Sequence, residues 1–296
     1  MFITFFTVFS FCAEALMLPP GFVVRQFGHT RDKLSTAKIE QKVSYNDGTT
    51  FNETILFKAP NKYKVILSNS NGNVTFIRSG EKCAAVSSQK KVEMSCSPLA
   101  GLFYHNLLLS TNDPMIAYLK LLKITPREGI VSLKKNEENG AYVKPEGIVL
   151  VDYNNKPIYL IGVTDSLYKS TVSSVSGKSD INTALVDELK YKVPQLWMDK
   201  DDFLPIRVFG QYNGNDLELS LGSYIQDGNE VPFPKAVSLS LKGKKVVSFN
   251  VSVFESGVDI KDDIFAMDGF KKLQMVTQTE LPEGKSKMID YLKEYR

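Results

Sequence analysis

The chain has 296 residues, of which 43% are hydrophobic and 23% charged, a composition typical of a globular protein with one large or two smaller domains. Its 36 basic and 33 acidic residues are interspersed and give a formal net charge of +3. This charge pattern contains no nucleic-acid footprint, and it does not identify another partner.

The first 15 residues, MFITFFTVFSFCAEA, form an apolar run that ends in Ala-Glu-Ala, the small-residue spacing that signal peptidase accepts. We expect a signal peptide at 1–15, a mature chain beginning near Leu16, and a periplasmic location. A lipid anchor through Cys12 is disfavoured because the bulky Phe11 precedes it. The run is shorter than the ~20 residues of a membrane-spanning helix, and a later apolar stretch, 99–124, is interrupted by Asn-Asp-Pro.

A helix is expected just after the signal, in GFVVRQFGHTRDKL, and a strand-rich half follows it. In the run KYKVIL, Lys62 and Lys64 lie on one side of a strand and Tyr63, Val65 and Leu67 on the other. The turn sequences between such runs predict an antiparallel meander. Its strands are expected at 37–45, 51–58, 62–68, 73–79, 83–87 and 92–96.

Two cysteines remain after removal of the signal, Cys83 and Cys96. A hairpin folded about the polar tip 88–91 pairs Ser87 with Val92 and places the two cysteines opposite each other. Opposed Cα atoms in an antiparallel pair lie about 4.5–5.5 Å apart, which suits a disulfide in an oxidising compartment. We expect a disulfide, and two free buried thiols are the alternative.

The segment 98–124 changes to a helical period. Asp113 caps a second helix there, with Pro114 as its first residue. Both helices are apolar over much of their circumference, so we expect both to be buried. One face of the first helix carries Leu99, Leu102, Phe103 and Leu107.

The chain beyond this point is predicted to return to strands, at 129–134, 147–153 and 157–163. The Ser/Thr-rich stretch 164–182 is interpreted as a loop or mobile excursion and as the leading hinge candidate. An amphipathic helix is expected from about 283 to 295. Further alternating strands are expected within 217–221, 237–241 and 247–253, and the absence of repeats favours one extended sheet.

The sequence contains few of the residue types and motifs that are typical of catalytic sites. His29 and His105 are the two histidines, neither belongs to a metal-spaced cluster, and no GxSxG or phosphate loop occurs. The acidic cluster at 199–202 suits a solvated turn better than a cation site. We therefore expect no enzyme activity, no metal and no cofactor.

Three passages resemble a known family. They are ILFKAPNKYKVIL followed by FIRSGEK, LWMDKDDFLPIRVF, and KDDIFAM. They resemble the periplasmic lipoprotein carriers and outer-membrane lipoprotein-sorting proteins, the LolA/LolB-like half-barrels, over about residues 36–268. Ala59 stands where well-studied carriers have an arginine before the proline of the second strand. The central passage matches the family signature through Trp197, Asp199, Leu204, Pro205 and Arg207.

The resemblance implies an α+β fold, a curved antiparallel β-sheet or half-barrel with helices covering its concave apolar face. It implies one domain, 16–296, with an insertion at about 126–182 and with the helices of 98–124 as a lid. Read from the residues alone, the apolar positions are plain core. The implied hydrophobic cavity is lined by Tyr63, Val65, Leu67, Phe76, Leu102, Phe103, Met115 and Leu119.

The function so implied is a periplasmic carrier of lipid or lipoprotein acyl chains in outer-membrane lipoprotein sorting, with membrane-bound donor and acceptor proteins. The alternative is an envelope sensor or scaffold that binds a protein partner through the same half-barrel, with 164–182 as a contact loop. A third hypothesis, an exported hydrolase with an unrecognised site, ranks last. Co-purified lipid favours the first hypothesis and a stoichiometric protein partner favours the second.

Overall fold

The computed structural model describes residues 18–92, 94, 104–109, 112–124, 147–176, 181–190, 192–212 and 214–295. The predicted signal peptide and its cleavage site lie outside these residues, as does the predicted strand at 129–134. Among the described helices, none is both long enough and apolar enough to cross a membrane.

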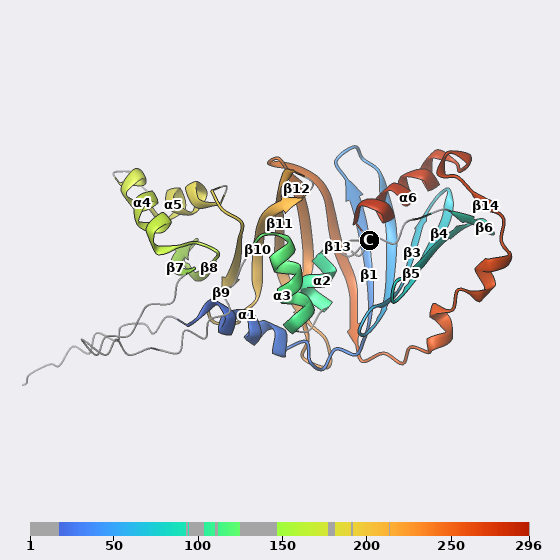
Figure 1. Ribbon diagram of the computed structural model, residues 1–296, viewed down its shortest axis with the longest axis horizontal. Helices are drawn as coiled ribbons and strands as arrows, with labels where there is room; N and C mark the ends of the chain where they lie inside the picture. Colours follow the sequence, from blue (N-terminus) through green and yellow to red (C-terminus); the bar gives the residue numbers. More distant parts are fainter. Residues whose placement is uncertain are drawn as a thin grey trace, which may run out of the picture.

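The fold is α+β, with fourteen strands in one open, curved sheet that forms a half-barrel (Figure 1). The strand order is β14-β6-β5-β4-β3-β2-β1-β13-β12-β11-β10-β9-β8-β7. All neighbours are antiparallel except β14 and β6, which are parallel, so the sheet is mixed rather than wholly antiparallel. The strands are β1 (Thr36–Tyr45), β2 (Thr50–Lys58), β3 (Lys62–Asn69), β4 (Gly72–Ser79), β5 (Lys82–Ser87), β6 (Lys90–Val92), β7 (Ile148–Tyr153), β8 (Lys156–Ile161), β9 (Gln195–Asp199), β10 (Pro205–Tyr212), β11 (Asn215–Gln226), β12 (Pro232–Leu241), β13 (Lys244–Ser256) and β14 (Met275–Val276).

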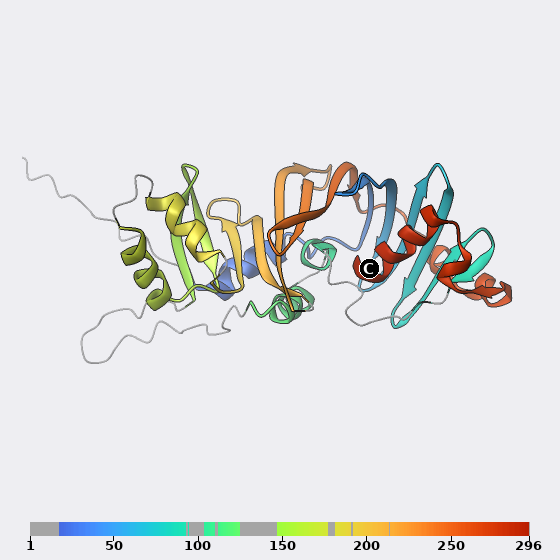
Figure 2. The same cartoon turned by 90° about the horizontal axis from the view of Figure 1, so that it is seen from above.

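Four helices cover the concave face of this sheet: α1 (Pro20–His29), α2 (Tyr104–Leu109), α3 (Asn112–Leu121) and α6 (Glu283–Tyr295). Two more, α4 (Asp165–Val175) and α5 (Ile181–Leu189), pack on the opposite face at the β7 edge (Figure 2). Short 3-10 helices, η1 (Asp262–Phe265), η2 (Asp268–Lys272) and η3 (Gln278–Glu280), follow β13 and precede α6.

The alternation of side chains along each strand separates these two layers. On β9, Leu196 and Met198 join the core of the concave face, whereas Trp197 between them joins the core under α4 and α5. On β10, Val208 joins the core of the concave face and Phe209 joins the core under α4 and α5. The edge of the sheet near β7 is therefore buried on both faces, and the expectation of helices on the concave face alone is incomplete.

The stretch 164–182 is not the loop that its composition predicts. Residues Asp165–Val175 form α4, and α5 begins at Ile181. The Thr164 hydroxyl caps α4 by accepting a hydrogen bond of 3.3 Å from the Leu167 amide. Hydroxyls of four Ser and Thr residues bond back to carbonyls three or four positions earlier, which satisfies them within the helix. The loop prediction is therefore wrong for the described part of this stretch, and its role as a hinge stays a prediction.

The hairpin β5–β6 has a different register from the predicted one. Ser88 and Gln89 both have positive φ, 49° and 62°, and form a two-residue turn instead of a four-residue tip. Ala85 therefore lies opposite Val92, a slip of two positions from the prediction. Cys83 lies half-buried on β5, while Cys96 lies outside the described residues, so the disulfide stays a prediction.

Candidate ligand-binding face

The concave face carries one continuous apolar cluster that runs the length of the sheet. All fourteen strands contribute at least one buried apolar side chain to it. Helices α1, α2, α3 and α6 contribute the opposing layer. These helices come from three separated parts of the sequence, so the layer over the sheet is assembled by tertiary contacts, including those of α3 with α1 and α2.

The strand residues predicted for the cavity lie at the β3–β4 end of this face. Val65, Leu67 and Phe76 are buried in the cluster, and Tyr63 is half-buried beside them, with its ring centroid 5.1 Å from that of Phe57. The helix over this end of the sheet is α6, which lies in front of β1 to β4 (Figure 1). The lid expected from 98–124 is therefore only part of the cover.

The helix residues predicted for the cavity lie further along the same face. Met115 and Leu119 of α3 are buried in the cluster, over β10 to β13 (Figure 1). Leu102 and Phe103 lie outside the described residues. The structure thus places the described candidates on one apolar face, and distributes them between an α6 end and an α3 end.

Helix α3 ends in direct contact with the backbone of the sheet. A Cβ placed on Gly210 of β10 would lie 3.1 Å from Leu122 Cβ and 3.2 Å from the Leu122 carbonyl oxygen, in the turn that ends the helix. Such spacing is tighter than ordinary van der Waals contact, so a Cβ at this position would require Leu122 to shift by a few tenths of an ångström. The absence of a side chain at Gly210 therefore allows the end of α3 to lie directly on the strand below it.

A carboxylate lies inside the apolar layer beneath α6. Glu53 of β2 is buried, and its Oε2 accepts hydrogen bonds of 2.6 Å from Gln41 Nε2 of β1 and 2.8 Å from the Tyr291 hydroxyl of α6. Sequence reasoning missed this group. The alternation of buried and exposed positions along the strand could have identified it, because Glu53 occupies an inward position between Phe51 and Ile55.

A buried arginine follows α1. The Arg31 side chain is fully buried, its guanidinium lies 4.4 Å above the ring centroid of Phe27, and its Nη2 donates a hydrogen bond of 2.7 Å to the Pro232 carbonyl. Burial lowers its pKa to about 10, an effect that Tyr224 and Asp227 partly offset. The group is therefore a cation at neutral pH in an apolar setting, and sequence reasoning did not single it out.

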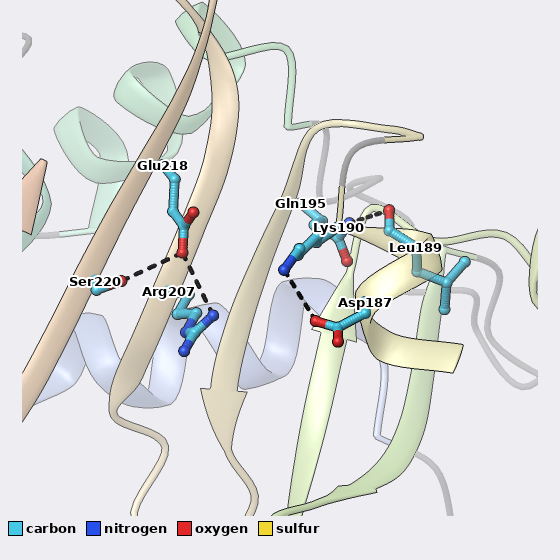
Figure 3. A network of polar contacts seen from close by, with 7 residues as sticks. All are labelled: Asp187, Leu189, Lys190, Gln195, Arg207, Glu218 and Ser220. Carbon is cyan, nitrogen blue, oxygen red and sulfur yellow. Dashed lines mark hydrogen bonds and ion pairs between the residues drawn. The ribbon is translucent and has the colours of Figure 1, made fainter. Parts of the chain in front are cut away.

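Two residues of the Trp197–Arg207 signature, Trp197 and Arg207 themselves, lie on the opposite face of the sheet. Arg207 of β10 pairs across the strands with Trp197 of β9, and its guanidinium lies 5.3 Å from the indole centroid. It also contacts Glu218 of β11, with 3.3 Å between Nη1 and Oε1 (Figure 3). The Gln195 amide donates to the Leu189 carbonyl at 2.7 Å and so joins the end of α5 to β9.

The rest of the signature forms the turn between these strands. Asp199 Oδ1 accepts hydrogen bonds from the amides of Asp201 and Asp202, and the Asp199 amide donates to the Leu204 carbonyl at 2.9 Å. Pro205 then begins β10. The acidic cluster is thus a capped turn, and among the described residues no group of three or more His, Cys, Asp or Glu side chains is arranged to hold a metal ion.

No family model matches the sequence, and no curated protein matches it. Solved structures that are similar include a LolA superfamily protein from Nitrosomonas europaea, 13% identical, with a TM-score of 0.47 over 85% of this chain and 99% of that one. A DUF1329 family protein from Desulfovibrio piger is 7% identical, with a TM-score of 0.48 over 85% and 97%. A domain assigned to an outer-membrane lipoprotein-sorting protein from Vibrio parahaemolyticus is 9% identical, with a TM-score of 0.38 over 85% and 98%.

Proposed function

We propose that this protein is a periplasmic carrier that binds lipid or lipoprotein acyl chains on the concave face of its half-barrel. The observation that carries the proposal is the continuous apolar cluster, which extends from β14 to β7 under four helices from three separate parts of the sequence. Each CH₂ group removed from water contributes about 0.8 kcal/mol, so one or two acyl chains supply ample affinity. Release then follows from movement of a helix or from handover to an acceptor protein.

The proposal places the ligand between the sheet and the two covering units, α6 at one end and α2–α3 at the other. An acyl chain is proposed to fit this place because both sides are apolar and α6 lies apart from the group of α1, α2 and α3, in which α3 contacts the other two. The residues proposed to line the site include the described candidates Tyr63, Val65, Leu67, Phe76, Met115 and Leu119.

Two leucines of α3 offer a matched test. Leu119 is fully buried against the sheet, whereas Leu121, two residues later, is 54% exposed. In a titration with a fluorescent fatty acid, we expect Leu119→Glu to abolish binding and Leu121→Glu to leave it unchanged. Circular dichroism must show an intact sheet in both variants. Failure of the wild-type protein to bind the probe, together with an absence of co-purified lipid in native mass spectrometry, would refute the proposal.

The alternative is a sensor or scaffold that binds a protein partner, and two exposed apolar side chains favour it. Phe22 of α1 is 44% exposed and Leu121 of α3 is 54% exposed, and these two helices contact each other. On this alternative, Leu121→Glu abolishes binding of the partner. The two leucine variants therefore separate the two functions, since a carrier depends on Leu119 and a scaffold on Leu121.

A further inference from the structure

The guanidinium of Arg31 retains hydrogen-bonding capacity that the described part of the chain does not use. Its Nη2 donates to the Pro232 carbonyl, while neither Nε nor Nη1 has a hydrogen-bond partner among the described residues, although the side chain is fully buried. Leaving buried donors of a charged group unsatisfied is costly, so such groups are rare and call for an explanation.

The acidic side chain whose charge acts on Arg31, Asp227, already accepts hydrogen bonds from other groups. Asp227 Oδ1 accepts hydrogen bonds of 3.0 Å from the amides of Asn229 and Val231, and Oδ2 accepts one of 2.6 Å from the Ser256 amide. The hydroxyl of Tyr224 donates to the Pro205 carbonyl at 2.7 Å. Asp227 therefore attracts Arg31 through space, and neither side chain occupies the unused donors.

The surroundings of Arg31 belong to the apolar face. Phe27 beneath the guanidinium is part of the continuous core cluster, as is Phe233, which follows Pro232 on β12. Phe233 in turn stacks on Phe254, with 4.4 Å between ring centroids. A cation with unused donors thus lies beside residues of the face on which an acyl chain is proposed to bind.

We infer that Arg31 binds the negatively charged head group of the acyl ligand, a carboxylate in the case of a fatty acid. This inference rests on the proposed function, because the apolar face holds the chain and Arg31 holds the head. A carboxylate oxygen accepts from the unused N–H groups and neutralises the buried charge. Arg31 is thereby a specificity residue that selects acids over neutral lipids.

The test compares a fluorescent fatty acid with its methyl ester at neutral pH. We expect the wild-type protein to bind the acid about tenfold more tightly than the ester, a difference of about 1.4 kcal/mol. In Arg31→Met, which replaces the unbranched arginine stem by an uncharged one and removes the guanidinium, the two affinities become equal while the ester binds as in the wild type. If that variant fails to fold, equal affinities of the wild-type protein for acid and ester still overturn the inference.

The outcomes separate this inference from the proposed function. If acid and ester bind the wild-type protein equally, the head-group role is wrong and the carrier function stands. If neither binds, both are wrong. A further experiment measures the melting temperature with inorganic phosphate in the absence of lipid. Suppose that phosphate raises the melting temperature of the wild type but not of Arg31→Met, and that acid and ester bind equally well. The site then binds a free anion, and the head-group role is wrong.

Discussion

The hydroxyl of Tyr291 on α6 donates a hydrogen bond of 2.8 Å to the carboxylate of Glu53 on β2, and both side chains are fully buried. The two residues are 238 positions apart in the sequence. The Tyr291 ring also packs edge-on against Phe51, with 5.0 Å between centroids. This contact attaches the last helix to the middle of the sheet through a polar group within an apolar layer.

We therefore expect Tyr291→Phe to lower the free energy of unfolding by about 1–3 kcal/mol, because Glu53 loses a buried donor while the ring packing is kept. Urea denaturation measures the change. Tyr168→Phe on α4, a half-buried tyrosine on the opposite face, is the control and is expected to be near neutral. Equal stability of Tyr291→Phe and the wild type would show that the hydroxyl contributes nothing to holding α6.

The contact between Gly210 and Leu122 predicts the effect of one added methyl group. Gly210→Ala places a Cβ about 3.1 Å from Leu122 Cβ, so the end of α3 must move or the protein loses about 1–3 kcal/mol of stability. We also expect faster uptake of a fluorescent fatty acid, measured by stopped flow. Gly222→Ala on the neighbouring strand β11 is the matched control, since a Cβ there meets nothing within 4 Å. Similar melting temperatures and uptake rates for the two variants would contradict the prediction.

The contacts of Arg207 with Trp197 and Glu218 predict that this residue stabilises the fold and does not bind the ligand. Arg207→Lys keeps the charge near Glu218 but loses the planar group that lies over Trp197, and we expect a loss of about 1–2 kcal/mol in stability. Affinity for acyl chains should be unchanged, because these side chains lie on the face opposite the proposed site. A drop in affinity without a drop in stability would show that the signature acts in binding.

Asp227 predicts a loss of stability at acidic pH. Partial burial raises the pKa of the Asp227 carboxyl, but hydrogen bonds from Ser256, Val231 and Asn229 outweigh this and hold the pKa below its ordinary value. The resulting stabilisation is present above the unfolded pKa of about 3.9 and is lost as the pH falls through the lower folded pKa. Asp227→Asn keeps one acceptor oxygen and should flatten this part of the pH profile. A variant that loses stability with falling pH as steeply as the wild type would contradict the prediction.

The predicted disulfide between Cys83 and Cys96 is tested chemically. Thiol labelling of the unfolded, unreduced mature protein should find no free thiol, and reduction should lower the stability by about 2–4 kcal/mol. Two free thiols would refute the pairing. The intact mass of the exported protein tests a separate prediction, that the mature chain begins near Leu16.

Local patterns in the sequence were sufficient to predict much of the fold. The helix expected at about 283–295 is α6, Glu283–Tyr295, because its apolar positions repeat with the period of a helix. The strands from β1 to β5 begin and end within one residue of their predicted bounds, because alternation and turn residues are local signals. These elements predict one extended sheet with an apolar face, whereas the half-barrel shape was implied by the resemblance of three sequence passages to a known family.

Tertiary contacts determine the features of the fold that local sequence patterns did not predict. The Ser/Thr-rich α4 is helical because its apolar stripe packs on β7 and its hydroxyls bond within the helix, which composition does not reveal. The β5–β6 register depends on left-handed backbone at Ser88 and Gln89, which residue type did not indicate. The surroundings of Arg31 and Glu53 depend on residues about 200 positions away. An isolated charge in a sequence has no assigned partner, and only the folded chain determined which groups surround these two side chains and what they can bind.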